Sequence, residues 1–575
     1  MFKKFKLTAP LLLAYILITM FVFENVFFEN KCYASEVSSS DTVKLTVDTN
    51  AMTATMSNKF ITIKFNKSGV GYSLLKDGKE LIGPAKGFYS STEGKYQFAP
   101  DSLKVVTNTS DTIDIAYISK WGELHYVMRS GISGVYSYFI ADDMGNIGEF
   151  RTLYRFDGSI FRNGYNSVKS GPLPTLSDIK NGTKLQDETY KFKDGTVYSK
   201  YDWADYESQD HVHGLYGNDF GAWVIPASNE YYNGGPMRQE LMVHTESSTG
   251  DGVLLNMLKG SHYGVGNVTI PKNKIYGPWL VYINNGDIKD AQERATEEEK
   301  SWPYNWLNNP NYPLSRTTVS GKLNVSGRNS NEDATVVLAK PGNEIYTQGE
   351  DYIFYSKADS HGYFSIPNVR PGSYTLYAYS TSGDITDQFQ KDNINVSGSS
   401  MNLGDLDWTP TTHSNSLWKI GTADRTSSEF KLGNLGRQYG LPEKVPADLT
   451  YNIGSSTEAN DWYYAQTKVG TWNVNFNLNN SYTGNAYLTI GVASAARKPK
   501  VDVYVNGHME GTLDYSLEND ATTYRSANQS GRYRNAVIKF PANILNTGNN
   551  AISFKMSKVD PDGGIMYDII KLETD

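Results

Sequence analysis

The sequence predicts an all-β protein made of several domains. With 575 residues, the chain is far longer than a single hydrophobic core usually supports. Short runs of alternating apolar and polar residues recur between Gly, Asn and Asp turns, and aromatic residues make up 13% of the chain, with Tyr the commonest of them. Because Tyr and β-branched residues favour strands, and period-two alternation favours sheets with one buried face, we expect a series of antiparallel sandwiches.

The N-terminus has the three parts of a secretory signal peptide. A basic start, Met1–Lys6, precedes the apolar run Leu11–Phe28, and the small residue Ala34 stands where cleavage would follow. We therefore expect residues 1–34 to be a signal peptide and the mature chain to be secreted and extracellular, with an uncleaved anchor as the alternative. The single cysteine, Cys32, lies in this segment, so we expect a mature chain without disulfides or a cysteine nucleophile.

Residues 35–304 are predicted to form the first and largest domain, an antiparallel sandwich. Alternating runs such as Phe60–Phe65 and Thr112–Ile118 indicate its strands, which continue through Tyr282. This domain contains the stretch 197–264, whose composition is described below.

The first helix with clear boundaries is predicted over Ile288–Trp302. Asp287 can cap its N-terminus, and Pro303 ends it. The segment that follows, residues 305–313, is rich in Asn and Pro and is typical of a linker.

Two smaller β domains are predicted after the linker. Residues 315–405 contain short alternating strands and a Pro-Gly turn, which indicates a small sandwich. Residues 412–575 contain about eight strand-like runs, beginning with Leu417–Gly421, and this number favours a jelly roll of the kind common in carbohydrate-binding modules.

The charge balance excludes some classes of partner. The formal net charge is −8 and no block of basic residues occurs, so the chain lacks the field that nucleic acid or an anionic membrane would require. A local cationic pocket for an acidic sugar is compatible with this balance.

The stretch 197–264 has the composition of a sugar-binding cleft. It combines aromatic residues, amides, a few cations and four of the eight histidines. Aromatic faces stack on pyranose rings, amides reach hydroxyl groups, and cations neutralise a uronate carboxylate. The structural alternative is an ordinary β core with exposed tyrosines.

Several motifs and the order of the domains resemble polysaccharide lyase family 4, the rhamnogalacturonan endolyases. The most specific motifs are Gly148–Arg155, Tyr198–Tyr201, Asn233–Pro236 and Gly260–Tyr263. The resemblance covers essentially the whole mature chain. It implies that the first domain is a mutarotase-like lyase sandwich, the second is immunoglobulin-like or fibronectin III-like, and the third is a jelly roll resembling a carbohydrate-binding module.

The resemblance also implies a reaction and its residues. The family cleaves the rhamnose-(1→4)-galacturonate bond of rhamnogalacturonan I by β-elimination, in which a base takes the C5 proton and an acid protonates the departing O4. The family pattern places the base on Lys200, the proton donor on His262 and two carboxylate-facing arginines on Arg151 and Arg155. The further residues that we expect to contact the substrate are Tyr201, His213, Tyr231 and Tyr232.

Physical chemistry supports these roles. Lys200 must be neutral to accept a proton, whereas free lysine has a pKa of ~10.4, and two nearby guanidinium groups would lower that value. Arg151 and Arg155 are four residues apart, so on a strand both point to one face and can clamp one carboxylate. The same cations would stabilise the charge that develops after proton loss. We therefore expect an alkaline pH optimum.

The chain departs from the fungal form of the family shortly before His262. That form has two tyrosines there, and this sequence has Leu255 and Met257. The change puts in doubt any tyrosine contact from this strand, and Tyr201, Tyr231 or Tyr232 would then supply the aromatic surface.

Each candidate residue also has a structural interpretation. Lys200 would be a solvated charge on a strand, Arg151 and Arg155 a surface pair beside Glu149, and His262 a turn histidine. His211 and His213 share a strand face, but no third metal ligand stands out nearby, so we predict no metal site there. His213 and His244 are reserve candidates for the proton donor.

Two other functions remain open at this point. One is a non-catalytic protein that binds plant polysaccharide. The other is a hydrolase or epimerase on the same sandwich, and a hydrolase would require two carboxylic side chains facing the bond. Asp202, Asp205 and Glu207 are available for that purpose.

Cofactor and partner expectations follow from the same chemistry. We expect no cofactor for catalysis, because arginine can neutralise the uronate, while a structural Ca²⁺ in the jelly roll, with Asp568 as an oxygen ligand, stays open. The expected partner is rhamnogalacturonan I or a related pectic polysaccharide. We expect a monomer that contacts neither nucleic acid nor, once the signal peptide is cleaved, membrane.

Overall fold

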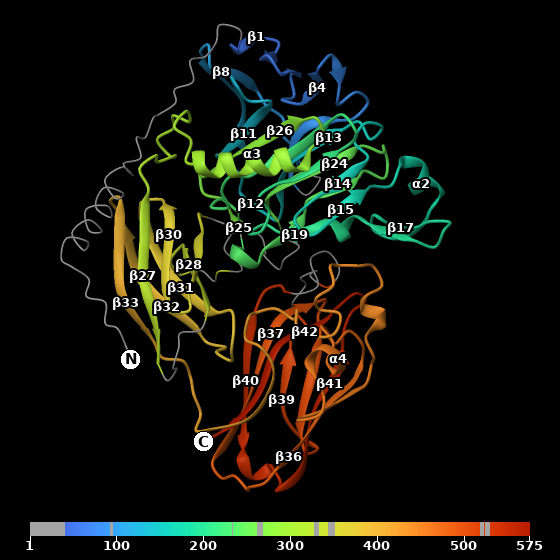
Figure 1. Ribbon diagram of the computed structural model, residues 1–575, viewed down its shortest axis with the longest axis vertical. Helices are drawn as coiled ribbons and strands as arrows, with labels where there is room; N and C mark the ends of the chain where they lie inside the picture. The colour runs from blue at the N-terminus through green and yellow to red at the C-terminus, as the bar shows by residue number, and fades with distance from the viewer. Residues whose placement is uncertain are drawn as a thin grey trace, which may run out of the picture.

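Three β-rich bodies follow one another along the chain (Figure 1). The computed structural model describes residues 41–92, 96–232, 234–260, 268–326, 333–342, 345, 351–517, 523 and 530–575. The predicted signal peptide, Cys32 and His262 lie outside the described residues. The all-β, multidomain fold class predicted from the sequence is confirmed.

The first body is a sandwich of two large antiparallel sheets. Its ten-stranded sheet has the order β1-β2-β3-β4-β6-β13-β24-β23, with β5 beside β4 and β7 beside β6. The bounds of these strands are β1 Lys44–Asp48, β2 Thr53–Ser57, β3 Ile61–Phe65, β4 Gly71–Lys76, β5 Lys79–Glu80, β6 Gly87–Thr92, β7 Tyr96–Gln97, β13 Phe150–Phe156, β23 Val243–Thr245 and β24 Gly252–Lys259.

The second sheet of this body has nine strands in the order β15-β14-β20-β21-β26-β11-β10-β9-β8. Its strands are β8 Ser102–Asn108, β9 Thr112–Ser119, β10 Gly122–Arg129, β11 Gly134–Ala141, β14 Asn163–Tyr165, β15 Ser170–Pro172, β20 His213–Tyr216, β21 Gly221–Ile225 and β26 Ile275–Asn284.

Side-chain alternation places the core between the two sheets. On β3, Ile61, Ile63 and Phe65 are buried, while Thr62 and Lys64 between them are half-buried. On β13, Tyr154 points into the core, where its hydroxyl meets the indole Nε1 of a tryptophan on β26. The neighbours of Tyr154 along β13 therefore point to the outer face of the ten-stranded sheet, and this face carries the candidate site.

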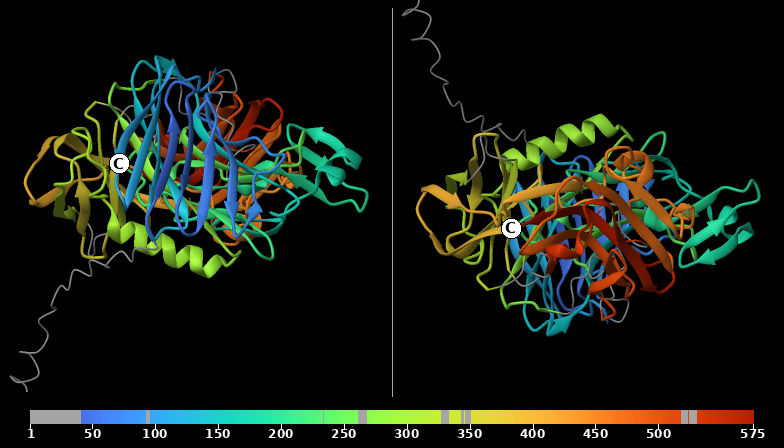
Figure 2. Two further views of the ribbon diagram at one scale, coloured as in Figure 1. Left: turned by 90° about the horizontal axis from the view of Figure 1, so that it is seen from above. Right: turned by 90° about the horizontal axis from the view of Figure 1, so that it is seen from below.

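The helix α3, Ile288–Ser301, covers the outer face of the nine-stranded sheet (Figures 1 and 2). Asp287 caps it by accepting the backbone N–H groups of the next turn, as the sequence predicts, and the helix ends at Ser301, one residue before the predicted end. Ala291 and Ala295 are buried against the sheet, because small side chains allow the helix to approach closely. A shorter helix, α2 Leu176–Asn181, was not predicted.

In the described part of the first body, three small sheets are formed by segments that lie between the strands of the two large sheets along the chain. The three-stranded sheet of β16 Thr183–Gln186, β17 Thr189–Lys191 and β18 Val197–Ser199 projects from the body (Figures 1 and 2). Directly after β18, the chain turns into the 3₁₀ helix η1, Lys200–Trp203. The remaining pairs and turn are β12 Asn146–Ile147 with β25 Val268–Thr269, β19 Ala204–Tyr206 with β22 Gln239–Leu241, and η2 Gly235–Met237.

The second body is a small sandwich of three and four strands. Its first sheet has the order β30-β27-β33 and its second the order β29-β28-β31-β32. Several strands are nine residues long, which is longer than the short strands expected from the sequence. The strands are β27 Thr317–Val325, β28 Ala334–Ala339, β29 Phe354–Ala358, β30 Tyr363–Val369, β31 Gly372–Ser380, β32 Gln388–Val396 and β33 Ser400–Trp408.

The third body packs a four-stranded sheet, β34-β42-β37-β40, on a five-stranded sheet, β35-β36-β41-β38-β39. Trp462 and Trp472 are fully buried between them. The strands are β34 Asn415–Gly421, β35 Leu449–Asn452, β36 Gly470–Leu478, β37 Asn485–Ala496, β38 Lys500–Val505, β39 His508–Asp514, β40 Arg534–Pro541, β41 Gly548–Lys558 and β42 Gly564–Thr574, with short helices α4 Glu458–Asp461, η4 Pro442–Lys444 and η5 Ala542–Ile544.

A buried ion-pair cluster joins the first two bodies. The carboxylate of Glu230, which is 1% exposed, accepts hydrogen bonds from Arg316 at 2.7 Å and from Arg370 at 2.8 and 3.0 Å. Both arginines belong to the second body. Burial alone would raise the pKa of Glu230, but Arg370 and Arg316 outweigh that effect and lower it.

The third body is also tied to the other two. Arg437 pairs with Asp202 of η1, and Gln239 of β22 donates to the carbonyl of Ser530 at 2.9 Å. Toward the second body, the backbone N–H of Ala423 donates to the carbonyl of Gly383 at 3.1 Å. Among the helices described, none has the length and apolar character needed to cross a membrane.

Candidate active site

Arg155 and His244 occupy one row across three neighbouring strands. Arg155 on β13 pairs with Val253 on β24, and Val253 pairs with His244 on β23. Residues in register on adjacent strands point to the same face, so the guanidinium and the imidazole both lie on the outer face of the ten-stranded sheet. Arg151 lies on the same face, because it is four residues from Arg155 on the same strand.

Both arginines carry acidic partners from the protein itself. Arg155 pairs with Glu246 at 2.8 Å and with Asp251 at 3.6 Å. Arg151 pairs with Glu149 at 3.0 Å, and its Nε donates to Ser91 at 3.3 Å. The side chain of Arg155 is 15% exposed and that of Arg151 is 26% exposed, so a substrate carboxylate can reach both. It would share them with their acidic partners.

Lys200 starts η1 and does not sit on a strand, contrary to the expectation from its Tyr-Ser-Lys-Tyr context. The preceding strand β18 ends at Ser199, and the backbone then turns into the 3₁₀ helix. The Lys200 ammonium lies 3.6 Å from the carboxylate of Asp187 and 5.1 Å from the ring centroid of Tyr201. Its side chain is 19% exposed, which leaves it accessible to a substrate.

The pKa of His244 is lowered by its surroundings. Burial lowers the pKa of His244 well below its ordinary value, and the positive charges of Lys200, Arg155 and Arg151 lower it further. The imidazole is therefore neutral at neutral pH. Its Nδ1 is buried and has no hydrogen-bond partner within the described part of the chain. A neutral imidazole suits hydrogen-bond acceptance, which argues against His244 as the reserve proton donor.

Tyr89 and Lys86 extend the cluster along β6. The Arg155 guanidinium lies 5.7 Å from the ring centroid of Tyr89, and the Lys86 ammonium lies 3.9 Å from it. Burial raises the pKa of Tyr89, although Arg155 opposes the shift. Burial and then Arg155 lower the pKa of Lys86. Sequence reasoning missed both residues, because the pairing of β6 with β13 has no local signature.

Tyr201, Tyr231 and Tyr232 were expected to contact the substrate, but all three side chains are buried. Tyr201 is 1% exposed and donates its hydroxyl to Asp187, while Tyr231 is fully buried. Tyr232 is 7% exposed and donates to the side chain of Asn256 at 2.7 Å. These rings pack inside the first body and leave no broad face for a sugar.

His213 is likewise a structural histidine, contrary to the expected substrate contact. Its side chain is 1% exposed, with Nδ1 2.7 Å from Asp210 and Nε2 2.8 Å from the carbonyl of Leu255. His211, by contrast, is largely exposed and pairs with Glu299. The two histidines therefore do not share a common site.

The predicted proton donor, His262, lies outside the described residues, but the strand that leads to it is described. That strand, β24, ends at Lys259, which pairs with Phe150, the residue next to Arg151. Lys259 is buried and donates to the carbonyl of Gly148 at 2.6 Å. The chain thus leaves β24 at the Arg151 end of β13.

The carboxylates that a hydrolase would need are engaged inside the protein. Asp202 pairs with Arg437, and Glu207 is buried and pairs with Arg238. Asp205 is 1% exposed and accepts the backbone N–H of Ser167 at 2.9 Å. None of these three carboxylates forms an open pair facing a substrate bond.

The third body contains a buried acidic cluster. Asp568 is fully buried; its Oδ1 accepts the backbone N–H groups of Asp424 at 3.0 Å and Arg425 at 2.8 Å, and its Oδ2 has no hydrogen-bond partner among described residues. Burial and the nearby Asp424 and Glu429 raise the pKa of Asp568 well above its ordinary value. Within the described ranges, no three His, Cys, Asp or Glu side chains are assembled as a ready metal site.

Comparisons with known proteins agree with this architecture. Family profiles match in chain order: "Rhamnogalacturonan lyase B, N-terminal" over residues 99–300, "Polysaccharide lyase family 4, domain II" over 331–403, and "Polysaccharide lyase family 4, domain III" over 416–572. A rhamnogalacturonate lyase of Dickeya dadantii strain 3937 is 37% identical over 572 residues, covering 93% of this chain and 95% of the relative. This chain belongs to polysaccharide lyase family 4. It is a polysaccharide lyase, and the family and enzyme class expected from the sequence are confirmed.

Other matches to this family 4 lyase are more distant. A probable rhamnogalacturonate lyase B of Aspergillus terreus strain NIH 2624 is 24% identical, covering 90% of this chain and 95% of the relative. A family 35 carbohydrate-binding module from Clostridium thermocellum aligns with 18% of this chain and 70% of its own at 22% identity, with a TM-score of 0.13. At this TM-score, the match is no evidence for a shared fold or function.

Proposed function

We propose that this lyase cleaves rhamnogalacturonan I at the rhamnose-(1→4)-galacturonate bond by β-elimination. The observation that carries the proposal is that Arg155 and the neutral His244 lie in one row on one face of the sheet, with Arg151 on the same strand and Lys200 of η1 near enough to lower the pKa of His244. A uronate lyase needs cations for the carboxylate and a base beside them, and these residues supply both. The names of the relatives in Dickeya and Aspergillus support rhamnogalacturonan as the substrate.

The proposed reaction moves one proton to the enzyme and one to the leaving group. Neutral Lys200 takes the C5 proton of galacturonate, and Arg151 and Arg155 hold the C6 carboxylate as charge develops on it. The C4–O4 bond then breaks, a C4=C5 double bond forms, and His262 gives a proton to the departing O4. Because Lys200 must be neutral, the expected optimum is alkaline.

His244 fits this scheme as a hydrogen-bond acceptor between the cations. Because it is neutral, it can accept a hydrogen bond without adding to the repulsion among the neighbouring cations. Tyr89 and Lys86 flank Arg155 and complete this face.

The experiment that tests the proposal follows the ultraviolet absorbance of the unsaturated uronate during incubation with rhamnogalacturonan I. Lys200→Ala and His262→Ala are each expected to lower kcat by at least ~100-fold. The matched control is Lys272→Ala, which removes an exposed lysine paired with Asp142. Reducing ends that increase without absorbance would identify a hydrolase. Binding without either signal would identify a saccharide-binding protein.

We also propose that the protein works as a secreted, extracellular monomer. The signal-like N-terminus and a polymeric plant substrate, which cannot enter a cell intact, support secretion. In this scheme the arginines neutralise the uronate, so catalysis needs no metal ion.

A structural Ca²⁺ near Asp568 is a separate proposal about the third body. Its support is the unpartnered, buried Oδ2 of Asp568 and the nearby carboxylates of Asp424 and Glu429. Hard oxygen ligands of this kind suit Ca²⁺, which when bound would supply the missing positive charge. The side chains would have to turn toward the ion, because they are not assembled as a ready metal site in the described structure.

A further inference from the structure

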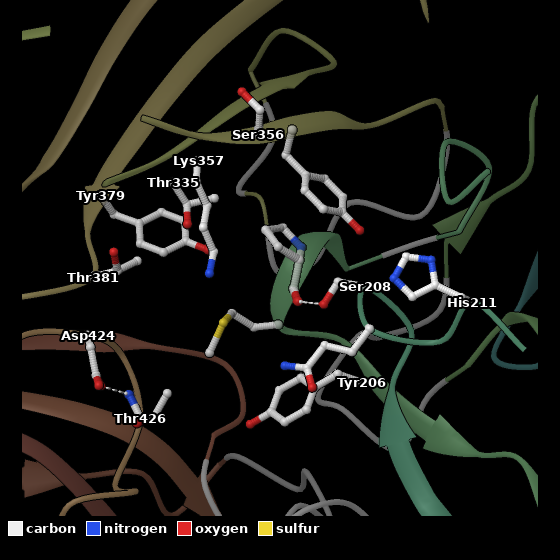
Figure 3. A pocket seen from close by; sticks show the side chains of 14 residues that line it. Tyr206, Ser208, His211, Thr335, Ser356, Lys357, Tyr379, Thr381, Asp424 and Thr426 are labelled. Atoms are coloured by element: carbon white, nitrogen blue, oxygen red, sulfur yellow. Dashed lines mark hydrogen bonds between the residues drawn. The ribbon is translucent and has the colours of Figure 1, made fainter. Parts of the chain in front are cut away.

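A cavity of about 590 Å³ lies where the three bodies meet (Figure 3). Tyr206 and His211 line it from the first body, Tyr355 and Tyr379 from the second, and Asp424 from the third. Arg151, Arg155, Lys200 and His244 are not among its lining residues. The cavity is therefore separate from the cationic face, and its volume falls within the ~300–1,000 Å³ typical of small-molecule sites.

The walls of the cavity are fixed by contacts between the bodies. The Tyr206 hydroxyl lies 2.7 Å from the hydroxyl of Ser530 in the third body. The Arg425 guanidinium of the third body stacks 3.9 Å from the ring centroid of Tyr379 in the second. Asn229 of the first body reaches the hydroxyl of Tyr355 at 3.5 Å. Because each wall is held by a neighbouring body, the site is preformed and little ordering entropy opposes binding.

The lining combines aromatic rings with hydroxyl groups. Tyr379 and Tyr206 line the cavity together with Thr335, Thr381 and Ser208 (Figure 3). Tyr206 and Tyr379 are only 7% and 2% exposed, so Tyr355, which is half-buried, offers the freest aromatic surface. One ring that can stack, surrounded by hydroxyl groups that can donate and accept, matches the alternating apolar and hydroxyl faces of a sugar.

The charges around the cavity favour a neutral ligand. Lys357 and Asp424 contribute opposite charges, and His211 is already paired with Glu299. Among the described residues, no arginine lines the cavity, whereas two arginines and a lysine gather at the cationic face. The carboxylate of a uronate would be attracted by Lys357 and repelled by Asp424. A neutral sugar experiences neither effect.

We propose that this cavity is a second saccharide site, which binds a neutral unit of one or two sugar residues. The site acts as a binding subsite for neutral parts of a polysaccharide and performs no chemistry. It depends on the contacts between the three bodies and not on the roles proposed for Lys200 and His262.

The test is isothermal titration of the mature full-length chain with galactobiose, arabinobiose and digalacturonate as probes. At least one neutral disaccharide is expected to bind at one site per chain. Tyr355→Ala is expected to weaken this binding about tenfold, and Thr381→Trp, which fills the cavity, to abolish it. The matched control is Tyr363→Ala, which removes a 57% exposed tyrosine of the same body that does not line the cavity.

Three outcomes would overturn the proposal. They are the absence of saturable heat with both neutral disaccharides, binding that survives both cavity variants, and binding that is lost in Arg155→Gln, which would place the sugar at the cationic face. Melting temperatures identify variants that fail to fold, and the exposed Lys357→Ala then replaces Tyr355→Ala. The titration measures binding and not cleavage, so a failed lyase assay leaves this test unaffected.

Discussion

Arg155 and His244 are aligned on the two sides of Val253, on strands that are far apart in the sequence but neighbours of the same middle strand. This alignment holds a guanidinium close enough to an imidazole to depress its pKa. The site thus combines permanent cations with a neutral imidazole that can accept a hydrogen bond, beside the proposed base Lys200. That combination suits a reaction in which negative charge develops on a carboxylate and a proton must leave carbon.

The first prediction concerns the titration of His244. Arg155→Gln removes one of the charges that lower the pKa of His244 and leaves Glu246 and Asp251 without their partner, so the pKa of His244 is expected to rise. NMR of histidine-labelled protein, with His244→Gln used for assignment, measures this directly. Arg129→Gln is the control, because Arg129 pairs with Asp111 elsewhere in the body. An ordinary titration of His244 in the unsubstituted protein would contradict the electrostatic assignment.

The second prediction concerns Asp187, which lies 3.6 Å from the Lys200 ammonium. If Lys200 is the base, Asp187→Asn makes its charged form less favourable, so the neutral base is available at lower pH. The acidic limb of the kcat/KM profile is then expected to move down by about half a pH unit, because Asp187 is partly exposed.

Asp194→Asn provides the matched control for this shift. Asp194 is an exposed carboxylate in the same projecting region, where it caps a turn by accepting from Thr196. Profiles measured at low ionic strength should separate the two variants, since salt screens exposed charges. An upward movement of the limb in Asp187→Asn would exclude this role for the carboxylate.

The fold class could be predicted from the sequence, and so could the common orientation of Arg151 and Arg155 in the site. Helix α3 followed from Asp287, the helical composition and Pro303, because these signals are local. The common face of Arg151 and Arg155 followed from their spacing on a strand. Both inferences use periodicity within a single element, which a sequence shows directly.

The remaining parts of the site depend on pairing that a sequence does not show. The proximity of His244 to Arg155 requires the order β13-β24-β23, and that of Tyr89 requires β6 beside β13. The burial of Tyr231 and His213 is equally invisible, because the same residues would serve an open cleft or a packed interior. Lys200 was expected on a strand, since nothing local marks the turn into η1.

The third prediction concerns the junction of the first two bodies. Glu230→Gln leaves Arg316 and Arg370 buried without a carboxylate, which is expected to cost about 3–5 kcal/mol of unfolding free energy at neutral pH. Calorimetry should show a lower melting temperature for this variant. Glu293→Gln, which removes an exposed partner of Lys289 on α3, should change stability by less than about 0.5 kcal/mol.

The same junction predicts a pH dependence. Because the pKa of Glu230 is lowered in the folded protein, its stabilisation is present above the ordinary value of 4.5 and disappears as the pH falls through the lowered value. The difference in melting temperature between Glu230→Gln and the unsubstituted protein should therefore shrink under acid conditions. A constant difference would show that the loss arises from packing instead of charge.

The fourth prediction concerns Glu429 in the third body. Burial, and then the negative charge of Asp424, raises the pKa of Glu429 to about 8. The unfolded chain releases this proton near 4.5 and the folded chain only near 8, so stability is expected to fall as the pH rises between these values. Asp424 and Asp568, whose pKa values are also raised by burial, act in the same direction.

Glu429→Gln should flatten this decline, because the amide mimics the protonated acid and releases no proton. Melting temperatures in the presence of a chelator, measured from acid to mildly alkaline pH, provide the comparison, with the exposed Glu443→Gln as the control. Added Ca²⁺ should stabilise the unsubstituted protein most at the alkaline end, where the carboxylates are charged, and should stabilise Glu429→Gln less. Equal effects of Ca²⁺ on both proteins at every pH would mean that the ion does not bind at Glu429.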